Sequence, residues 1–189
     1  MGARIIAIAT SNKHKVEEIN NILSGCGYRV EPVNVPKIEV QSASLVEVAT
    51  FAAATAYHVL HRPVIVEDAG LFVEALNGFP GPYSAYVYKT IGISGLLRLL
   101  EGESNRKAVF RSVIALAHRG GVEIFTGETR GAISLEPRGS QGFGFDPVFV
   151  PLGETRTFAE MSIEEKNRFS HRGRAAKKLC EWLTREQLL

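Results

Sequence analysis

Apolar runs and helical periodicities alternate along the first part of the chain. Residues 4–9 form a short, largely apolar run that suits a buried strand. Apolar residues then recur at helical spacing over 16–23, and a second strand is predicted over 28–35. Another helical face covers 45–59, and 64–66 follows as a further strand. This order predicts strands and helices that pack in alternation.

The second part of the chain has a different pattern. A turn cluster over 77–82 precedes a helical pattern over 83–100. Two strand-like segments, 108–117 and 122–135, flank a glycine pair and predict a long β-hairpin. A loop and two helices close the chain. Because a hairpin follows alternating strands and helices, we predict an α/β fold with a mixed sheet.

Residues 162–172 combine helix-start signals with basic side chains. Residues 162–165 read Ser-Ile-Glu-Glu, a capping box that predicts a short helix carrying Lys166. Ser170 is predicted to cap the last helix. The free N–H groups of that helix, with His171 and Arg172, form a donor-rich corner suited to a carbonyl oxygen or an anion. A basic helix start on a solvated surface is the alternative.

Length and composition narrow the possible partners and the location. The 189 residues suffice for one domain, or for two lobes that share a sheet. A net charge of +2 does not indicate nucleic acid or an acidic membrane, and no apolar stretch reaches the ~20 residues of a membrane-spanning helix. We therefore expect a cytoplasmic protein in which Cys26 and Cys180 are free thiols, with a disulfide between them as the alternative.

The turn after the first predicted strand has phosphate-binding chemistry. Thr10, Ser11, Asn12 and Lys15 stand where a strand leads directly into a helix N-terminus. Exposed N–H groups and the positive end of the helix dipole attract phosphate there. The sequence has no Walker A motif, so this turn is not a P-loop. An ordinary capped helix with surface lysines is the alternative.

Two adjacent carboxylates, Glu67 and Asp68, are predicted at the carboxyl end of the strand over 64–66. Ligands of open α/β sheets bind at this end. Neighbouring side chains of a strand point to opposite faces, so one of these acids needs a helper to hold a metal ion. Glu39, which follows another strand, is the candidate helper. A solvated acid pair at a strand end is the alternative.

A glycine-containing loop over 142–147 presents two aromatic rings, those of Phe143 and Phe145. Flat rings on a backbone that can approach a ligand closely suit the stacking of a nucleobase. A turn with two core phenylalanines is the alternative. His58 and His61 have no third ligand nearby in the sequence, so we predict surface residues and not a metal pair.

Taken together, these motifs resemble those of the inosine triphosphate pyrophosphatase family, which hydrolyses aberrant purine nucleoside triphosphates. They stand in the family's order over nearly the whole chain. The matching segments are 11–15, 67–71, 78–84, 143–147, 157–161, 165–167 and 170–172.

The resemblance implies a single domain over 1–189, in which an elongated mixed β-sheet and flanking helices form two lobes around a central cleft. It implies hydrolysis of ITP, dITP or XTP to the nucleoside monophosphate and pyrophosphate. A requirement for Mg²⁺ and a homodimer are also implied, and neither nucleic acid nor a membrane is expected as a partner.

Roles for single residues follow from the same resemblance. Glu39 and Asp68 match the metal-binding acids, and Asp68 also matches the residue that activates water, with Glu67 as the other candidate proton acceptor. The positions expected to bind substrate are Thr10, Ser11, Asn12, Lys15, Ala69, Phe143, Gly144, Phe145, Asp146, Lys166, Ser170, His171 and Arg172.

Three positions depart from the family pattern. Ala69 replaces a frequent serine or threonine, Phe145 replaces a tyrosine or tryptophan, and Tyr86 stands where many relatives have arginine. A hydroxyl contact at 69 and a polar contact at 145 are therefore lost. The alternatives to this activity are a Maf-like nucleotide pyrophosphatase, a nucleotide-binding protein without catalysis, and a phosphatase that releases orthophosphate.

Overall fold

The computed structural model describes residues 2–35, 38 and 40–186. Its strands are β1 (Arg4–Ile8), β2 (Tyr28–Pro32), β3 (Val64–Val73), β4 (Pro80–Gly81), β5 (Lys107–His118), β6 (Gly121–Ile133) and β7 (Phe149–Pro151). They form a sheet in the order β2-β1-β3-β5-β6-β7, with β4 paired to β3. β1 is parallel to both of its neighbours, whereas β3, β5, β6 and β7 are antiparallel in succession. The prediction of a mixed sheet is confirmed.

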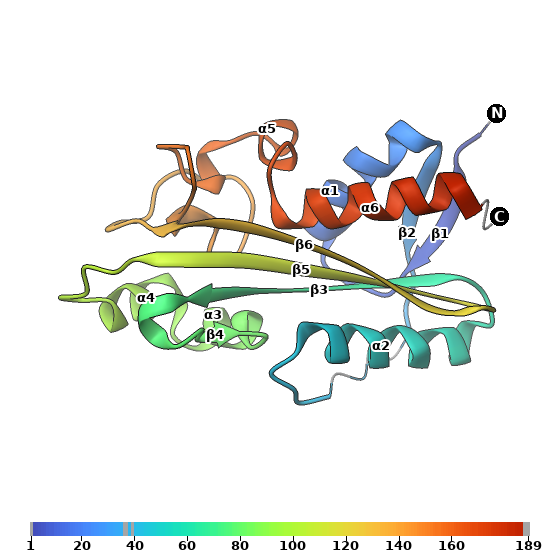
Figure 1. Cartoon of the computed structure of the whole chain (residues 1–189), viewed down its shortest axis with the longest axis horizontal. Helices are drawn as coiled ribbons and strands as arrows, with labels where there is room; N and C mark the ends of the chain where they lie inside the picture. The colour runs from blue at the N-terminus through green and yellow to red at the C-terminus, as the bar shows by residue number, and fades with distance from the viewer. Residues whose placement is uncertain (1, 36–37, 39, 187–189) are drawn as a thin grey trace.

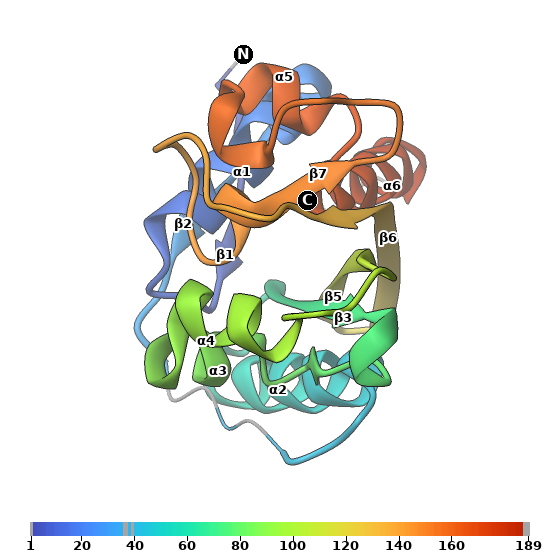
Figure 2. The ribbon, with the colours of Figure 1, turned by 90° about the vertical axis from the view of Figure 1, so that its left-hand side faces the viewer.

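Helices cover both faces of this sheet (Figure 1). The helices are α1 (Lys13–Leu23), α2 (Leu45–Leu60), α3 (Ser84–Thr90), α4 (Gly92–Leu99), α5 (Ile163–Asn167) and α6 (His171–Glu186). Short 3₁₀ turns are η1 (Ser24–Cys26), η2 (Glu74–Leu76), η3 (Asp146–Val148) and η4 (Phe158–Glu160). Helices α1, α5 and α6 lie on one side, and α2, α3 and α4 lie on the other (Figure 2). In the described parts of the chain, no helix combines the length and the apolarity needed to cross a bilayer.

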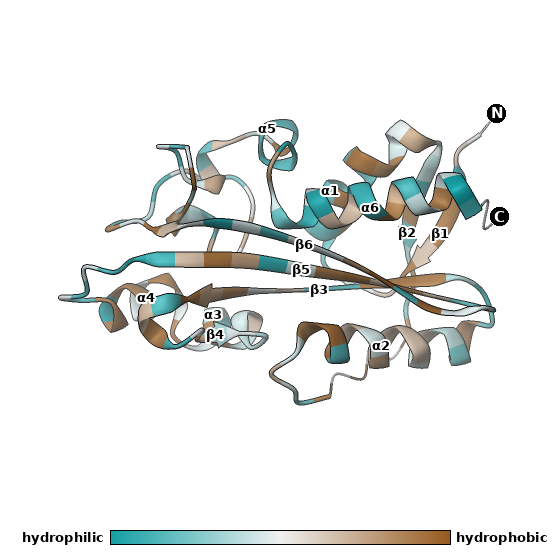
Figure 3. Ribbon diagram, viewed as in Figure 1, coloured by the Kyte–Doolittle hydropathy of each residue, from teal (hydrophilic) through white to brown (hydrophobic). Residues whose placement is uncertain are grey.

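Strand β3 is apolar because both of its faces are buried. Ile65 packs in one cluster with residues of α1 and α6. Val64 and Val66 point the opposite way and pack with the alanines of α2. A strand covered on both faces reads as a continuous apolar run, which explains the pattern over 64–66. Figure 3 shows apolar colour along much of β3 and β5, while α6 alternates between polar and apolar positions.

The hairpin of β5 and β6 gives the sheet its length. The predicted hairpin is confirmed, and the 13 residues of β6 span roughly 40 Å at the usual rise of a strand. Its far end packs on a second core that includes residues of α3, α4 and β7. The helical pattern over 83–100 divides into α3 and α4, because Gly92 takes a left-handed φ of 64° that interrupts the helix.

Local helix-start signals agree with the structure. The Ser44 hydroxyl accepts a hydrogen bond from the Glu47 N–H, and Ser162 and Glu165 form a reciprocal capping box at the start of α5. The predicted end of β3 was wrong. The strand continues through Glu67 and Asp68 to Val73 and stays paired with β5 over its whole length, so the two acids lie within the strand.

The expectation of free thiols was also wrong. Cys26, at the end of α1 and η1, forms a disulfide with Cys180 of α6, with their Cα atoms 6.1 Å apart. Both residues pack against the core shared by α1 and α6, which brings together positions separated by 154 residues. The disulfide therefore links the turn that follows α1 to α6, on one side of the sheet. The cytoplasmic location expected from the sequence stays a prediction.

We predict that the double variant Cys26→Ser/Cys180→Ser unfolds more readily than the parent protein. Opening a covalent loop of this length returns conformational entropy to the unfolded chain, and such losses typically cost about 2–4 kcal/mol. Thermal unfolding without reductant measures the change, and a thiol count by mass spectrometry serves as the control. If the mass spectrum shows an oxidised cysteine pair in the parent protein and the variant still unfolds at the same temperature, the prediction is contradicted.

Candidate active site

The turn between β1 and α1 is held by side-chain caps. The Asn12 carboxamide oxygen accepts hydrogen bonds from the N–H groups of His14 (3.0 Å) and Lys15 (3.4 Å), and the Asn12 N–H donates to the Thr10 hydroxyl (3.1 Å). The helix start predicted from residues 10–12 is confirmed. Lys15 then reaches across to β3, where its ammonium donates to the Glu67 carbonyl oxygen at 3.0 Å.

The start of α6 lies directly on the sheet. The Ser170 hydroxyl accepts a hydrogen bond from the Gly173 N–H at 2.9 Å, which confirms the predicted cap. A Cβ atom at Gly127 of β6 would collide with the His171 carbonyl oxygen, so glycine allows this close approach. His171 and Arg172 are therefore buried, in contrast to a basic helix start on a solvated surface.

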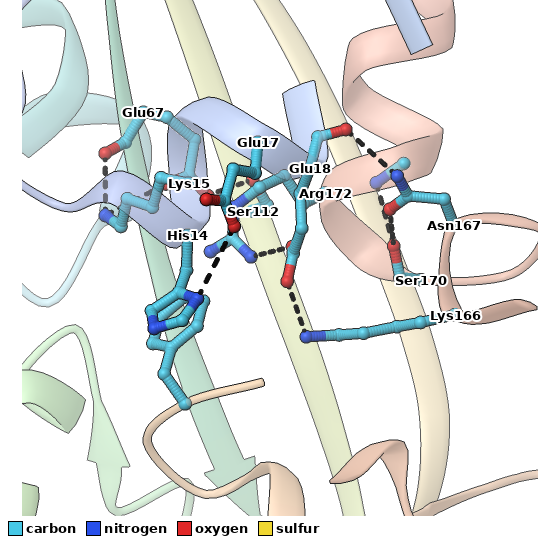
Figure 4. A network of polar contacts seen from close by, with 12 residues as sticks. His14, Lys15, Glu17, Glu18, Glu67, Ser112, Lys166, Asn167, Ser170 and Arg172 are labelled. Carbon is cyan, nitrogen blue, oxygen red and sulfur yellow. Dashed lines mark hydrogen bonds and ion pairs between the residues drawn. The ribbon is translucent and has the colours of Figure 1, made fainter. Parts of the chain in front are cut away.

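A buried network of opposite charges joins α1, β3, α5 and α6 (Figure 4) and includes Asp146 of η3. Arg172 bonds Glu67 through Nε (3.0 Å) and Glu18 through Nη1 (2.5 Å). The Lys166 ammonium lies 2.7 Å from both Glu18 and Asp146. Lys15 lies 2.9 Å from Glu67 Oε2. We call this set the ionic cluster; its members are Glu18, Glu67, Asp146, Lys15, Lys166 and Arg172.

The ionic cluster shifts the pKa values of its buried acids and of Arg172. Burial alone would raise the pKa of Glu18, but Arg172 and Lys166 outweigh it and lower that pKa to about 2. Burial opposes ionisation of Glu67 as well, yet Arg172 and Lys15 hold its pKa well below the usual range. The same carboxylates raise the pKa of Arg172 against its own burial. Glu18, Glu67 and Arg172 are thus buried as paired ions.

Beside the ionic cluster lies a cavity of about 340 Å³. It is large enough for a small-molecule ligand. Its wall includes most of the substrate positions expected from the sequence, together with Asp68. These residues are Asn12, Lys15, Asp68, Ala69, Phe143, Gly144, Phe145, Asp146, His171 and Arg172. Four regions of the chain, residues 12–15, 68–69, 143–146 and 171–172, therefore meet at one place.

The loop before η3 brings Phe143 over the ionic cluster. Asp146 accepts a hydrogen bond from the Phe143 N–H at 2.9 Å. The Phe143 ring stacks on His14 with centroids 5.4 Å apart, and the Arg172 guanidinium carbon lies 5.2 Å from the ring centroid. Phe145 is buried in the second core, at the far end of the hairpin, and also lines the cavity. It is therefore both a core phenylalanine and a residue of the ligand site.

His171 is the buried imidazole of the cavity wall. Its ring stacks on Phe110 with centroids 4.6 Å apart and an angle of 10° between the planes. Burial lowers the pKa of His171 well below its usual value, and Arg172 and Lys166 lower it further. Its Nδ1 atom has no hydrogen-bond partner among the described residues. A neutral imidazole with an unsatisfied nitrogen is a group that a bound ligand can satisfy.

Some predicted positions do not line the cavity. Thr10 and Ser11 border a separate hollow with residues 32–35. Glu67, Lys166 and Ser170 are buried and are absent from the cavity wall as described. Glu39 lies outside the described residues, so its role as a metal ligand stays a prediction. His58 and His61 are exposed, as expected.

Sequence reasoning missed two residues that hold the site. Glu18 bonds both Arg172 and Lys166, and the Ser112 hydroxyl donates to Glu67 Oε1 at 2.6 Å. The spacing of Glu18, one helical turn after Lys15, was a usable signal, because both side chains lie on one side of a helix. Ser112 gave no signal, since a lone serine within a predicted strand has no distinctive pattern.

The chemistry of the cavity wall suits a hard cation. Across the residues described, no group of three or more His, Cys, Asp or Glu side chains gathers as a protein-only metal site. Magnesium does not need such a cage, because it keeps several waters and uses one or two carboxylates with the phosphates of its substrate. Asp68 supplies a carboxylate to the cavity wall, so the residues present fit Mg²⁺ bound together with a nucleotide.

Comparison with known proteins gives the family. The profile of the Ham1 family matches residues 6–182. The chain belongs to the Ham1 family. A relative named dITP/XTP pyrophosphatase in Hyperthermus butylicus is 67% identical over 183 residues, which cover 97% of this chain and 96% of the relative. A relative of the same name in Methanopyrus kandleri is 53% identical, with 94% and 95% covered.

Solved Ham1 structures share the fold. The HAM1 protein of Coxiella burnetii superposes with a TM-score of 0.85 at 34% identity, and the match covers 96% of this chain and 99% of that one. The resemblance inferred from the sequence motifs is confirmed, and the Ham1 match leaves the Maf-like alternative without support. Every residue of the cavity wall lies within the segment matched to the Ham1 family.

We predict that acid weakens the protein through Glu18. The carboxyl titrates near 4.5 when unfolded and near 2 when folded, so the folded state binds fewer protons between these values. The stabilisation, on the order of 3 kcal/mol, is complete above about pH 4.5 and is lost as the pH falls toward 2. Urea unfolding of the parent protein and Glu18→Gln, measured from pH 7 to pH 2.5, should show the difference shrinking over this range.

Glu17→Gln is the matched control, because Glu17 lies on the exposed side of the same helix. This variant should track the parent protein at every pH. A difference between the parent protein and Glu18→Gln that stays constant with pH would contradict the ion pairing of Glu18.

Proposed function

We propose that this Ham1 protein hydrolyses ITP, dITP and XTP to the nucleoside monophosphate and pyrophosphate. The observation that carries the proposal is the shared cavity: an acid, a lysine at a helix start, and a buried His-Arg pair all contribute to one wall. The names of the relatives in Hyperthermus butylicus and Methanopyrus kandleri support the same substrates. Hydrolysis of these nucleotides removes aberrant purines from the pool of triphosphates.

Lys15 and the start of α1 are suited to the phosphates. The ammonium of Lys15 is held on β3, and the N–H groups and dipole of an 11-residue helix attract negative charge. Water attacks the α-phosphorus, the bond to the pyrophosphate oxygen breaks, and pyrophosphate leaves. Phosphoryl transfer of this kind depends on positioning and on neutralised charge more than on covalent catalysis.

Asp68 is the proposed acceptor of the proton from water. Asp68 is half-buried and belongs to the cavity wall. From there its carboxylate can contact a water molecule that attacks the bound nucleotide. Mg²⁺ is part of the proposal, with Asp68 and Glu39 as the residues that would hold it. When bound, the ion neutralises phosphate charge and orients the reacting groups.

Base selection is assigned to the His171–Arg172 side of the cavity, next to the Ser170 cap. Hypoxanthine and xanthine carry an oxygen at position 6, where adenine carries an amino group. Donors on this wall pair with the oxygen, and adenine would leave them unpaired at about 1–3 kcal/mol for each buried group. The neutral His171, with an unsatisfied Nδ1, and the guanidinium of Arg172 are such groups.

The proposal also includes the oligomeric state: the protein is a homodimer, as the family resemblance implies.

A panel of nucleotides tests the reaction. Purified protein is incubated with Mg²⁺ and ITP, dITP, XTP, ATP or GTP, and the products are separated. We expect pyrophosphate and the monophosphate from the first three, with ATP slower by at least 100-fold, and loss of turnover when EDTA removes the ion. Release of orthophosphate, or equal rates with ATP, would refute the proposal.

Asp68→Asn tests the proton acceptor. This change keeps the size of the side chain but removes the base, so we expect turnover of ITP to fall by at least 1,000-fold while the nucleotide still binds. Binding is measured by calorimetry and turnover by pyrophosphate release. Glu128→Gln, which changes an exposed acid outside the cavity, is the control and should keep full activity. Weaker binding with a normal rate at saturation would remove Asp68 from this role.

A further inference from the structure

Glu67 lies next to Asp68 in the sequence but in a different environment. Its side chain is fully buried, and Glu67 is not part of the cavity wall as described. The Oε1 atom takes hydrogen bonds from Arg172 Nε at 3.0 Å and from the Ser112 hydroxyl at 2.6 Å. The Oε2 atom lies 2.9 Å from the Lys15 ammonium. Oε1 is thus hydrogen-bonded by donors from β5 and α6, whereas Oε2 has the ion pair with Lys15 and no hydrogen-bond partner among the described residues.

The two cations on Glu67 serve different parts of the proposed substrate. Lys15 comes from the first turns of α1, and Arg172 comes from the first turn of α6. Both line the cavity, one at the phosphate-binding turn and one at the base-selecting wall. Arg172 is hydrogen-bonded to Oε1, and Lys15 forms an ion pair with Oε2 while donating a hydrogen bond to the Glu67 carbonyl oxygen. Glu67 therefore sets the separation between the two cations. A rigid link of this kind reduces the cost of arranging both groups around a ligand.

Ser112 fixes the orientation of Glu67. In the β3–β5 ladder, Ser112 is the partner of Ala69, two residues beyond Glu67. Directly opposed residues share a face of the sheet, as do residues two apart in a strand, so the hydroxyl points to the side of the Glu67 carboxylate. Ser112 is fully buried, and its hydroxyl donates to Glu67 Oε1 in the interior of the protein.

We propose that Glu67 is a positioning residue that sets the spacing of Lys15 and Arg172, and that Ser112 determines base preference through it. This inference rests on the proposed function. The two adjacent acids then have different roles. Asp68 faces the reacting groups, and Glu67 positions Lys15 at the phosphate end and Arg172 at the base end of the nucleotide. A proton acceptor needs contact with the attacking water, which Glu67 does not have in this arrangement.

Ser112→Ala tests the proposal with one probe for each end of the cavity. Inorganic tripolyphosphate reports on the phosphate end, and inosine reports on the base end; the affinity of each is measured by competition with ITP. Loss of a hydrogen bond to a buried charge corresponds to about 10-fold or more. We therefore expect both probes to bind about 10-fold more weakly and the preference for ITP over ATP to fall by a similar factor.

Ser134→Ala is the matched control. The Ser134 hydroxyl donates a hydrogen bond of the same length, 2.6 Å, to the Glu136 carbonyl oxygen and a longer one, 3.3 Å, to the Val148 carbonyl oxygen, and neither acceptor belongs to the ionic cluster. It should leave both affinities and the ITP preference unchanged. If Ser112→Ala weakens only one probe, or lowers the unfolding temperature without changing either affinity, the shared anchor is refuted.

Glu67→Gln separates positioning from proton transfer. A positioning role predicts that KM for ITP rises at least 10-fold while kcat stays well above that of Asp68→Asn, with circular dichroism confirming the fold. A proton acceptor would instead lose kcat as completely as Asp68→Asn does, at an unchanged KM, and that result would overturn the proposal. Failure of the proposed function is a separate outcome, because it appears in the parent protein as an absence of pyrophosphate.

Discussion

The neutralisation of buried charge within the ionic cluster is the interaction on which the rest of the site depends. Burying an ion is costly unless a partner of opposite charge lies within bonding distance. Here Glu18 holds Arg172 and Lys166, and Glu67 holds Arg172 and Lys15, so no member stands alone. Removing one partner leaves a charge uncompensated, typically at about 3–5 kcal/mol. The cluster therefore fixes how α1, β3, α5 and α6 meet, and with them the cavity.

The parts of this arrangement that the sequence predicted are governed by local contacts. Ser44, Ser162 and Ser170 each bond an N–H three residues ahead, and such contacts need only the residues beside them. The long hairpin followed from two strand-like segments that flank a glycine pair. Even the cavity was foreseeable in part, because the resemblance to a family places distant motifs in one site, as it did for Asp68 and Arg172.

The remaining features depend on contacts between residues far apart in the chain. A charge pair such as Glu67–Asp68 usually marks the end of a buried strand, but β3 continues because Arg172, Lys15 and Ser112 compensate Glu67 from other elements. The hydrophobic periodicity of the sequence does not indicate which distant residues those partners are. The same reason explains why a basic helix start on a solvated surface stayed open as an alternative for Arg172, and why the pairing of Cys26 with Cys180 was not chosen over free thiols.

The seclusion of the ionic cluster has a consequence for its response to electrolytes. Dissolved ions screen the interaction between solvent-exposed charges. At 0.1 M salt the screening length is about 10 Å. The exposed pair of Arg111 and Glu128 weakens in such a medium. The Arg172–Glu67 pair, with side chains 2% and 0% exposed, is out of reach of those ions. The arrangement of the buried ion pairs beside the cavity is therefore the same at high and low ionic strength. The attraction between exposed surface charges and an anionic ligand, by contrast, changes with ionic strength.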